Sequence, residues 1–494
     1  MIDIATERDI HVLRQMALLL DRENARLHAR LADALRANGA DAAAVQQELE
    51  ALREQLAQRN RALFGRSSEK RSSGDAAPTS TPAGPTTGHG RTAQVTLPIV
   101  DETFTLPEAE QQCPVCGGAL QLMAGQFEEA EEVTVVERRF EVRRLRRQKY
   151  RCRCNGHVAT APGPVKLQEG GRYSPAFAVE VAASKYLDHL PLERQVRVMA
   201  REGLTVTSQT LWDQIEVLAR ILQPTYEAVH EIVLGVPVVG ADETYWRLMA
   251  PRTGTSRWWA WCVTSADAVY FQILKQRSAD AARLILGRYG GVVMADGYGA
   301  YDALARGRPA CVLAHCWAHV RRKFVEIAEH FPVSCATVLD QIGALYDVEH
   351  EAQAQAGTDA DALLRTRATL RAARSHAIVA AIRDWAYTQS VLPQSGLGKA
   401  IAYMLGIWEG LTRFLADPRI PLDNNATERA IRGPVVGRKN FYGARSQRGT
   451  EVAALFYTLF ETAKVRGVEP KGYLHRAVMA ALREPGTVTL PEPA

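Results

Sequence analysis

Two aspartates stand where strand-forming segments could place them side by side. Asp242 lies within the apolar segment 238–248, and Asp296 ends the apolar run 291–296 and is followed by glycine. Either residue alone is more often a turn or capping residue, so only the combination points to chemistry. Because adjacent carboxylates repel each other, a cation must neutralise them. Oxygen ligands favour Mg²⁺ or Mn²⁺, and two such ions about 4 Å apart could hold the attacking and leaving oxygens of a phosphodiester.

A third carboxylate, Glu428, lies in the segment Asp-Asn-Asn-Ala-Thr-Glu-Arg-Ala-Ile-Arg at 423–432, where a helix is expected to begin. Asn425 and Glu428 also have the spacing of a capping box, in which the glutamate only holds the helix end. The segment by itself leaves both roles open. Glu243, the neighbour of Asp242, is expected to tolerate replacement much better than the three candidate ligands.

A separate cysteine cluster predicts a structural zinc site. Cys113-Pro-Val-Cys116-Gly-Gly has the form of a tight metal-binding turn, and Cys152, Cys154 and His157 follow further along the chain. Tetrahedral Zn²⁺ suits such ligands. Cys113, Cys116 and Cys152 are the firmer ligands, while Cys154 and His157 compete for the fourth place. Eight cysteines in 494 residues fit metal binding in a reducing compartment better than a disulfide framework.

Basic residues are concentrated between Glu137 and Arg153, in a segment interpreted as a hairpin. This density is typical of a surface that binds the phosphate backbone of DNA. The alternative is a solvated strand face balanced by the acidic residues between 128 and 132. The nine basic residues are Arg138, Arg139, Arg143, Arg144, Arg146, Arg147, Lys149, Arg151 and Arg153.

Further basic residues flank the candidate carboxylates and could hold a DNA end or contact phosphates. They are Arg321, Arg322, Arg429, Arg432, Arg438 and Lys439. For Arg321 and Arg322, an amphipathic helix packed through Trp317 and Phe324 explains the sequence equally well. The nearby His315, Cys316 and His319 could bind zinc, but a structural or site-lining role is the preferred interpretation.

A second candidate for DNA recognition is a pair of helices. A helix that ends at Gly203, followed by one capped by Thr207 or Ser208, has the spacing of a helix-turn-helix. The second helix would present Gln209, Thr210 and Gln214 outward, and these side chains could reach base edges. Two acidic residues on the same helix, at 213 and 216, argue against contact with phosphates, and any two packed helices would give a similar pattern.

The order of the predicted elements indicates a multidomain α/β protein. From Gly235 onward, three strands, a helix, a strand, a helix and a strand are expected, which is an α/β pattern. The expected domains are an N-terminal coiled coil at 1–65, a flexible linker at 66–96, a zinc-binding domain at 97–165, a helix-turn-helix-like domain at 172–232, the first part of the catalytic core at 233–324, an all-helical insertion at 325–415, the second part of the core with Glu428 at 416–466, and a C-terminal helix and tail at 467–494.

Composition excludes several classes of protein. The chain holds 60 Lys and Arg against 55 Asp and Glu, so its net charge of +5 does not by itself demand a nucleic-acid partner. No apolar run is long enough for a membrane span, and the charged N-terminus does not fit a signal peptide. We expect a cytoplasmic, nucleoid-associated protein that self-associates through its coiled coil, although an intramolecular hairpin would have the same pattern.

Several ordered motifs together resemble one known family. They are Leu-Phe-Gly-Arg-Ser-Ser-Glu-Lys at 63, Cys-Pro-Val-Cys-Gly-Gly at 113, Ala-Asp-Glu-Thr at 241, Ala-Asp-Gly-Tyr at 295, His-Cys-Trp-Ala-His-Val-Arg-Arg-Lys-Phe at 315, Asp-Asn-Asn-Ala-Thr-Glu-Arg-Ala-Ile-Arg at 423, Gly-Arg-Lys-Asn at 437 and Leu-Phe-Glu-Thr-Ala-Lys at 459. Over nearly its whole length the chain resembles the insertion sequence sixty-six family of bacterial transposases. The pair Cys152 and Cys154 departs from the usual spacing, which leaves the fourth zinc ligand open.

The resemblance implies a ribonuclease H-like core with a DDE triad at Asp242, Asp296 and Glu428, and a helical insertion before the glutamate. The implied reaction is hydrolysis at the transposon ends, then attack of the freed 3′-hydroxyl on target DNA, with Mg²⁺ or Mn²⁺ as cofactor and accessory proteins of the element as further partners. Two alternatives remain: a nuclease of the same fold without strand transfer, and a domesticated DNA-binding repressor.

Overall fold

The computed structural model describes residues 140–151, 158–250, 254–307 and 310–492, together with the isolated residues Arg26, Gly117 and Ala119. The expected coiled coil at 1–65 and the linker at 66–96 therefore lie outside the described residues, apart from Arg26. So do Cys113, Cys116, Cys152, Cys154 and His157.

A five-stranded mixed sheet forms the centre of the described chain. Its strands are β3 (Val238–Ala250), β4 (Gly254–Thr264), β5 (Val269–Leu274), β6 (Val292–Ala295) and β7 (Val312–His315). Their order is β5-β4-β3-β6-β7, in which the first three strands are antiparallel and β3, β6 and β7 are parallel. The order of strands and helices agrees with the order expected from the sequence, and β3 and β6 match the expected apolar segments 238–248 and 291–296 to within two residues.

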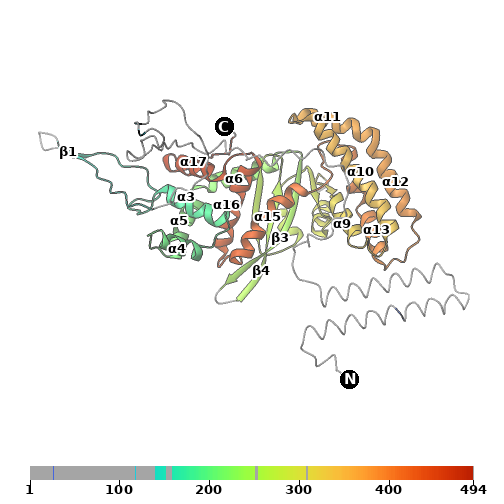
Figure 1. Cartoon of the computed structure of the whole chain (residues 1–494), viewed down its shortest axis with the longest axis horizontal. Coiled ribbons are helices and arrows are strands. Elements are labelled where there is room, and N and C mark those ends of the chain that lie inside the picture. Colours follow the sequence, from blue (N-terminus) through green and yellow to red (C-terminus); the bar gives the residue numbers. More distant parts are fainter. Residues whose placement is uncertain are drawn as a thin grey trace, which may run out of the picture. The chain divides into compact units, whose positions relative to one another are not determined.

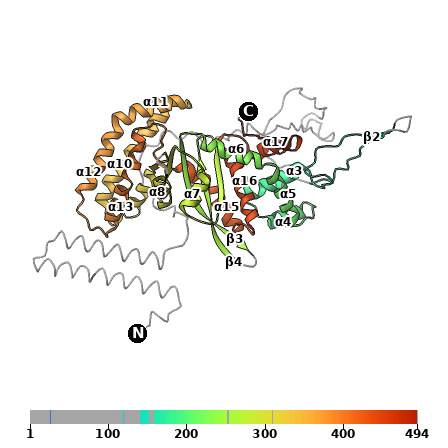
Figure 2. The same ribbon diagram turned by 180° about the vertical axis from the view of Figure 1, so that it is seen from behind.

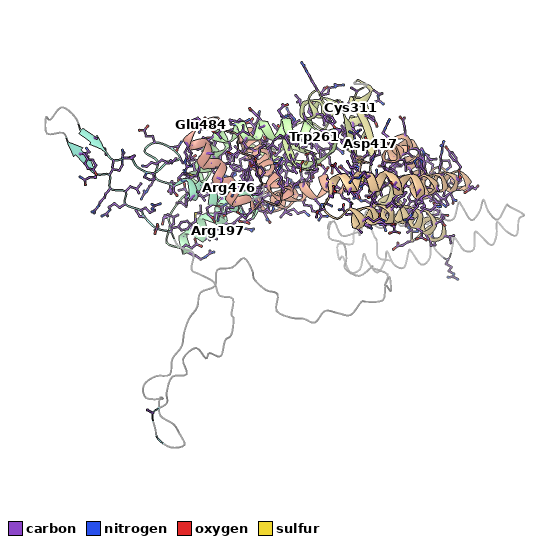
Figure 3. The ribbon with its side chains drawn as sticks, turned by 90° about the horizontal axis from the view of Figure 1, so that it is seen from above. Arg197, Trp261, Cys311, Asp417, Arg476 and Glu484 are labelled. Carbon is purple, nitrogen blue, oxygen red and sulfur yellow. The ribbon has the colours of Figure 1, made fainter. Side chains whose placement is uncertain are left out.

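Helices cover both faces of this sheet. On one face lie α15 (Asn425–Phe441) and α16 (Gln447–Val465), with α15 crossing β3 and β4 (Figure 1). On the other face lie α7 (Ala279–Leu286) and α8 (Gly299–Arg306), as the reverse view shows (Figure 2). Because side chains alternate along a strand, neighbouring residues of β3 point towards different helices. Trp261, fully buried in β4, packs edge-on against Tyr301 of α8 (Figure 3).

The edge strand β5 is closed by hydroxyl groups of α16. Thr458 Oγ1 accepts a hydrogen bond from the backbone N–H of Phe271 at 2.9 Å, and Thr462 Oγ1 accepts one from Val269 at 3.1 Å. The Thr462 hydroxyl also donates to the Val269 carbonyl at 2.9 Å. Backbone groups that would otherwise be unpaired at the sheet edge are thereby satisfied within the chain.

The helices before the sheet share its hydrophobic core. They are α3 (Pro175–Tyr186), α4 (Leu192–Arg201), α5 (Ser208–Ile221) and α6 (Gln223–Leu234). Buried residues of α3, α5 and α6 belong to one cluster with the strands and with α16 and α17 (Pro470–Arg483). Gly203 has φ +84° after α4, and the Thr207 side chain caps α5, which gives the expected helix-turn-helix-like pair. The pair is thus built into the same unit as the sheet.

Residues 332–415 are helical and enclose a second cluster of buried residues. The elements are α10 (Pro332–Ala356), α11 (Ala360–Leu370), η2 (Arg371–Ser375), α12 (His376–Thr388), α13 (Gly396–Gly406), α14 (Trp408–Thr412) and η3 (Arg413–Leu415), and they follow α9 (Trp317–Val325). Arg371 is 1% exposed and pairs with Glu349 at 2.7 Å, while its Nη1 donates to three backbone carbonyls. A buried charge is tolerated here because all of its neighbours are acceptors.

Within the described part of the basic segment, paired strands are present only from Lys149 onward. Residues 140–148 have no regular secondary structure, and β1 (Lys149–Arg151) pairs antiparallel with β2 (Val158–Thr160). Charge density does not set strand register, so the sequence could not show where the pairing begins. None of the described helices is long and apolar enough to cross a membrane.

Candidate active site

The two aspartates lie on neighbouring parallel strands of the sheet. Asp242 sits within β3, opposite Cys262 of β4, and its Oδ1 accepts a hydrogen bond from the Glu243 N–H at 2.8 Å. Asp296 comes directly after β6, and its Oδ1 accepts from the Tyr298 N–H at 2.9 Å. Gly297, which lies between Asp296 and Tyr298, has φ +86°, a value that an L-residue rarely adopts. The turn at Gly297 allows the Tyr298 N–H to orient the Asp296 side chain at the end of β6.

The helical insertion also holds this turn. The Tyr403 hydroxyl, on α13, donates to the Asp296 carbonyl at 2.6 Å. Nothing in the sequence indicated this contact, because Tyr403 lies 107 positions from Asp296 and in no recognisable motif.

The start of α15 is fixed to β3 by three polar side chains. Asn424 Nδ2 donates to the Ala241 carbonyl at 2.9 Å, immediately before Asp242. The Thr427 hydroxyl donates to Asn424 Oδ1 at 2.6 Å and lies 2.6 Å from the Thr264 hydroxyl. A side chain at Gly240 would collide with both Thr427 and Asn424, so the helix approaches the strand only because this position is glycine. These residues therefore set the position of Glu428 relative to Asp242.

Glu428 does not act as a capping-box residue. The N-cap of α15 is Asn424, and the side chain of Asn425 bonds to Asp423 instead. The Glu428 carboxylate faces α9, where Arg322 Nη2 and His319 Nε2 each lie 3.6 Å from one of its oxygens. Its Oε1 is buried without a hydrogen-bond partner. An unsatisfied buried carboxylate oxygen is costly to maintain and marks a place for a ligand.

Negative charge accumulates around Asp242. Burial, followed by the negative charges of Glu243, Asp296 and Glu428, raises the pKa of Asp242 to about 8, against the opposing effect of the hydrogen bond from the Glu243 N–H. Burial also lowers the pKa of His319, against the opposing effect of Glu428. A bound cation would remove the cost of ionising Asp242, so the donor set fits a hard divalent ion.

The carboxylates are not yet arranged as ligands of one ion. Within the described ranges, no three His, Cys, Asp or Glu side chains lie close enough together to hold a metal. The Glu428 oxygens are directed to Arg322 and His319 of α9. The two aspartates and the Glu428 Oε1 without a hydrogen-bond partner fit a divalent ion by the chemistry of their oxygens.

Glu243 has a structural role that conflicts with its expected tolerance to replacement. Its side chain is 1% exposed, accepts from Arg277 Nε at 2.7 Å and accepts from the Tyr301 hydroxyl at 2.8 Å. Removal of this carboxylate would leave Arg277 without its counter-ion. This role could not be predicted from the sequence, because Arg277 lies outside the recognised motifs.

Most of the basic residues near Glu428 are exposed, but one is not. Arg438 is 8% exposed, its guanidinium donates to the Tyr245 carbonyl and to Thr244 Oγ1, and it stacks on the Tyr245 ring at 4.2 Å. Because Arg438 is buried and its Nη1 is bound to β3, the structure does not present it as a DNA contact, in contrast to the exposed candidates. The exposed candidates are Arg321, Arg322, Arg429, Arg432 and Lys439.

The helix-turn-helix-like pair needs one similar correction. Gln214 is buried, with 9% exposure, and its amide lies against the Thr210 carbonyl, so it does not face outward. Gln209 is exposed and donates to Asp213 at 2.8 Å, and Thr210 is half-buried. The reason is helical periodicity, because Gln214 follows Leu211 by three positions and shares its buried face.

The other candidate residues fall into two groups. Arg143, Arg144, Arg146, Arg147 and Lys149 are exposed, whereas Arg138 and Arg139 lie outside the described residues.

His315 is buried against Gly410, and the Cys316 sulfur accepts the Asn424 N–H at 3.2 Å. The preferred structural role for these two residues agrees with the observed packing.

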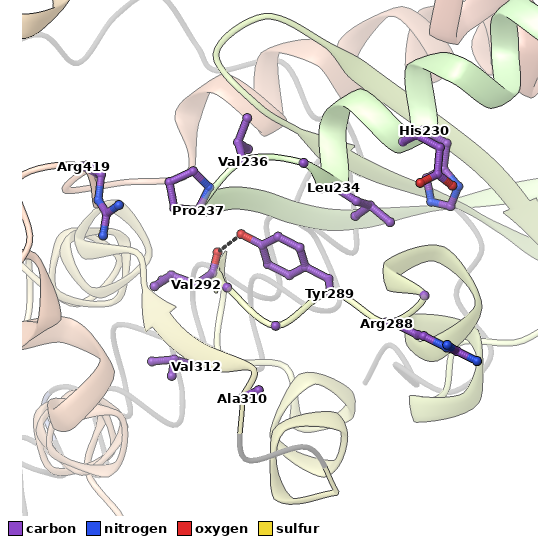
Figure 4. A pocket seen from close by; sticks show the side chains of 15 residues that line it. His230, Leu234, Val236, Pro237, Arg288, Tyr289, Val292, Ala310, Val312 and Arg419 are labelled. Carbon is purple, nitrogen blue, oxygen red and sulfur yellow. Dashed lines mark hydrogen bonds between the residues drawn. The ribbon is translucent and has the colours of Figure 1, made fainter.

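A cavity of about 850 Å³ lies at the opposite ends of the parallel strands, where they begin (Figure 4). Its lining includes Pro237, Tyr289 and Arg419, and the Tyr289 hydroxyl donates to the Val292 carbonyl at 3.2 Å. No candidate carboxylate lines this cavity. The chemistry is therefore to be sought at the other end of the strands.

Carboxylates on two strands and a helix, with exposed arginines on the same helix and on α9, are compatible with an enzyme that processes nucleic acids. The sequence profile described as "Transposase IS66 family" matches residues 170–452, and that of the "zinc-finger binding domain of transposase IS66" matches residues 110–155. The chain belongs to the IS66 family of transposases.

Its relatives include three proteins of Sinorhizobium fredii (strain NBRC 101917 / NGR234). "Uncharacterized protein y4jD" is 32% identical over 387 residues, which cover 74% of this chain and 74% of that protein. "Uncharacterized protein y4qI" is 33% identical over 381 residues, or 74% of this chain and 69% of its own. "Uncharacterized protein y4hP" is 26% identical over 393 residues, or 74% and 70%. No solved structure matches the chain.

The raised pKa of Asp242 predicts a pH-dependent stability of the metal-free protein. The folded-state pKa of about 8 exceeds the ordinary value of 3.8. The contribution of the Asp242 carboxyl to the unfolding free energy is therefore fully present below pH 4 and is lost as pH rises towards 8. Asp242→Asn, which does not ionise, should unfold at a higher urea concentration than the parent at pH 8.5. The difference in unfolding free energy between Asp242→Asn and the parent should be larger at pH 8.5 than at pH 5 by at least about 1 kcal/mol, roughly the equivalent of one pKa unit. Equal gains at both pH values would contradict the assignment.

Proposed function

We propose that this chain is a DNA transposase that cleaves at transposon ends and joins the freed 3′-hydroxyl to target DNA. Asp242, Asp296 and Glu428 form its DDE triad. The observation that carries the proposal is that two strands and one helix bring three carboxylates near enough for Asp296 and Glu428 to raise the pKa of Asp242.

We further propose that the sheet is a ribonuclease H-like core. Three antiparallel strands followed by two parallel ones, in the order β5-β4-β3-β6-β7, support this assignment. The first aspartate lies on the central strand β3 and the second follows its parallel neighbour β6. Crossings from β5 to β6 and from β6 to β7 contain the helices α7 and α8, as parallel connections require.

Divalent metal ions would supply charge neutralisation at the attacking and leaving oxygens of the phosphodiester. The protein's own contribution is to hold Asp242 and Asp296 on adjacent strands and to keep Glu428 in reach on α15. Arg322 and His319 hold the Glu428 carboxylate until it turns towards the aspartates. Arg322 can then pair with a phosphate of the DNA, so the phosphate replaces the Glu428 carboxylate as its partner.

The exposed side of α15 supports a DNA-binding role beside the triad. Arg429, Arg432 and Lys439 are all exposed on this helix, and at 1.5 Å per residue they extend over about 15 Å. This length corresponds to roughly four base pairs of a duplex strand. Cations at this spacing can hold the backbone of a DNA end next to Glu428.

A nuclease of the same fold without strand transfer is the second candidate. The same carboxylates would serve hydrolysis alone, and only joining of a pre-cut 3′-end separates the two activities. A purely DNA-binding protein would not need a buried Glu428 oxygen without a hydrogen-bond partner.

Replacement of any triad carboxylate is predicted to abolish activity without loss of DNA binding. Asp242→Ala, Asp296→Ala and Glu428→Ala should each lower cleavage and strand transfer on the element's own ends by at least about a thousandfold, the scale of an essential electrostatic group. Affinity for end DNA should stay within a few-fold, because no phosphate contact is removed. Gel-based cleavage and joining assays with Mg²⁺ or Mn²⁺ measure both steps.

Matched controls are available on the surface of the same unit. Asp280 is 78% exposed on α7 and Glu409 is 85% exposed on α14, and each makes only a local ion pair. Asp280→Ala and Glu409→Ala should retain parental activity. Near-normal activity in Glu428→Ala would remove it from the triad, and cleavage without joining in the parent would favour the nuclease.

We propose that the exposed basic segment at 143–149 contributes nonspecific affinity for DNA. Replacement of Arg143, Arg144, Arg146 and Arg147 by glutamine should reduce the slope of log affinity against log salt by about one unit per lost phosphate contact. Arg365→Gln with Arg374→Gln, in the insertion, is the control and should leave the slope unchanged. A parental slope in the fourfold variant would place the DNA elsewhere.

Zinc is proposed to be bound by Cys113, Cys116, Cys152 and Cys154. The match to the zinc-finger profile ends at residue 155, so it contains all four cysteines and leaves out His157. Zinc content measured after purification should fall strongly in Cys154→Ser and remain near one ion per chain in His157→Ala. The opposite pattern would make His157 the fourth ligand, and full zinc in Cys113→Ser with Cys116→Ser would refute the site.

A further inference from the structure

We propose that Arg277 is a positioning residue that links the two triad aspartates across the far face of the sheet. The link consists of Glu243, Arg277 and Tyr298 and is called here the Arg277 network. The inference rests on the proposed function, because it assigns a role in holding the carboxylates that the triad requires. None of these three residues contributes a ligand in that proposal.

The first half of the network ends next to Asp242. Glu243 follows Asp242 on β3 and points to the opposite face, where Arg277 Nη2 and Nε lie 2.6 Å and 2.7 Å from its Oε1. Tyr301 of α8 donates to Oε2 at 2.8 Å, so both carboxylate oxygens are engaged. Because the Glu243 side chain is almost completely buried, this pairing fixes the backbone of β3 at residue 243. The backbone N–H of Glu243 donates a hydrogen bond to Asp242 Oδ1, so the position of this backbone also orients the first aspartate.

The second half ends at Asp296. The Arg277 guanidinium lies 3.8 Å from the centre of the Tyr298 ring, and the Tyr298 hydroxyl donates to the Arg277 carbonyl at 3.0 Å. The Tyr298 N–H donates to Asp296 Oδ1. Tyr298 is therefore held by Arg277 at its ring and at its hydroxyl, while its backbone orients the second aspartate. The Trp259 ring, 5.0 Å from the guanidinium, is a further aromatic neighbour of Arg277.

The two halves of the Arg277 network are built in the same way. In each case, a backbone N–H that orients a triad carboxylate belongs to a residue whose side chain is bound by Arg277. A planar guanidinium can donate to a carboxylate in its plane and stack on an aromatic ring with its face, which a lysine ammonium cannot do at once. Groups that contact a metal ligand without binding the metal set the orientation of that ligand, and their loss typically lowers metal affinity or activity by about 10- to 100-fold.

The test compares metal requirement with DNA binding and folding. In Arg277→Gln, the Mn²⁺ concentration for half-maximal cleavage should rise by about 10- to 100-fold. The rise in melting temperature on addition of Mn²⁺, which needs no catalysis, should shrink at the same Mn²⁺ concentrations. Affinity for end DNA without divalent metal should change by less than about twofold. Arg277→Lys should show a smaller but clear shift, because it retains the charge and loses the planar donor pair.

The Tyr298 variants separate stacking from a general loss of stability. Tyr298→Leu removes the ring, whereas Tyr298→Phe retains it. The Mn²⁺ concentration for half-maximal cleavage should therefore rise at least about fivefold more in Tyr298→Leu than in Tyr298→Phe. Arg283→Gln is the matched control, since Arg283 lies on α7 and pairs only with the exposed Asp280. If Arg277→Gln does not fold, the comparison of the two Tyr298 variants still decides.

Three results would overturn the inference. Weaker binding of end DNA with an unchanged Mn²⁺ requirement would make Arg277 a phosphate contact. A lower melting temperature with a parental Mn²⁺ requirement would make the network purely structural, as would equal shifts in Tyr298→Leu and Tyr298→Phe. These failures are distinct from failure of the proposed function, which would appear as cleavage retained in Asp242→Ala.

Discussion

The hydrogen bond from Asn424 to the Ala241 carbonyl is the contact on which the candidate site depends. It joins two segments 183 residues apart, and the whole helical insertion lies between them in the chain. The bond forms only because Gly240 leaves room for Asn424 and Thr427 against the strand. The protein thus tolerates a large insertion in its core because the chain on either side of it is joined by buried polar contacts.

Buried charge is handled in two ways in this molecule. Arg371 in the insertion is bound by Glu349 and by backbone carbonyls, and the buried Glu243 carboxylate on β3 is bound by Arg277 and Tyr301, so the surroundings of both charges are fixed. Glu428, by contrast, lies 3.6 Å from the Arg322 guanidinium and 3.6 Å from the His319 ring, and it has an oxygen without a hydrogen bond. The first arrangement gives rigidity, and the second leaves one side chain ready to exchange partners.

Much of the fold could be predicted from the sequence, because strand alternation and apolar runs define β3 to β7 directly. Asp242 and Asp296 were found for the same reason, since each stands in or after such a run. The sequence could not show which face a residue occupies after long-range packing, so Arg438 and Gln214 were wrongly expected at the surface. It also could not show Tyr403 or Arg277, whose partners are distant in the chain and leave no periodic signal.

The threonine hydroxyls of α16 have a consequence for self-assembly. A bare edge strand can recruit a strand from a second molecule, and extended sheets or fibres can grow in this way. On β5 the backbone N–H groups of Val269 and Phe271 are already bonded to Thr462 and Thr458 of the same chain. Addition of a strand from a second molecule at β5 would require these two hydrogen bonds to break, so this edge is protected against continuation of the sheet.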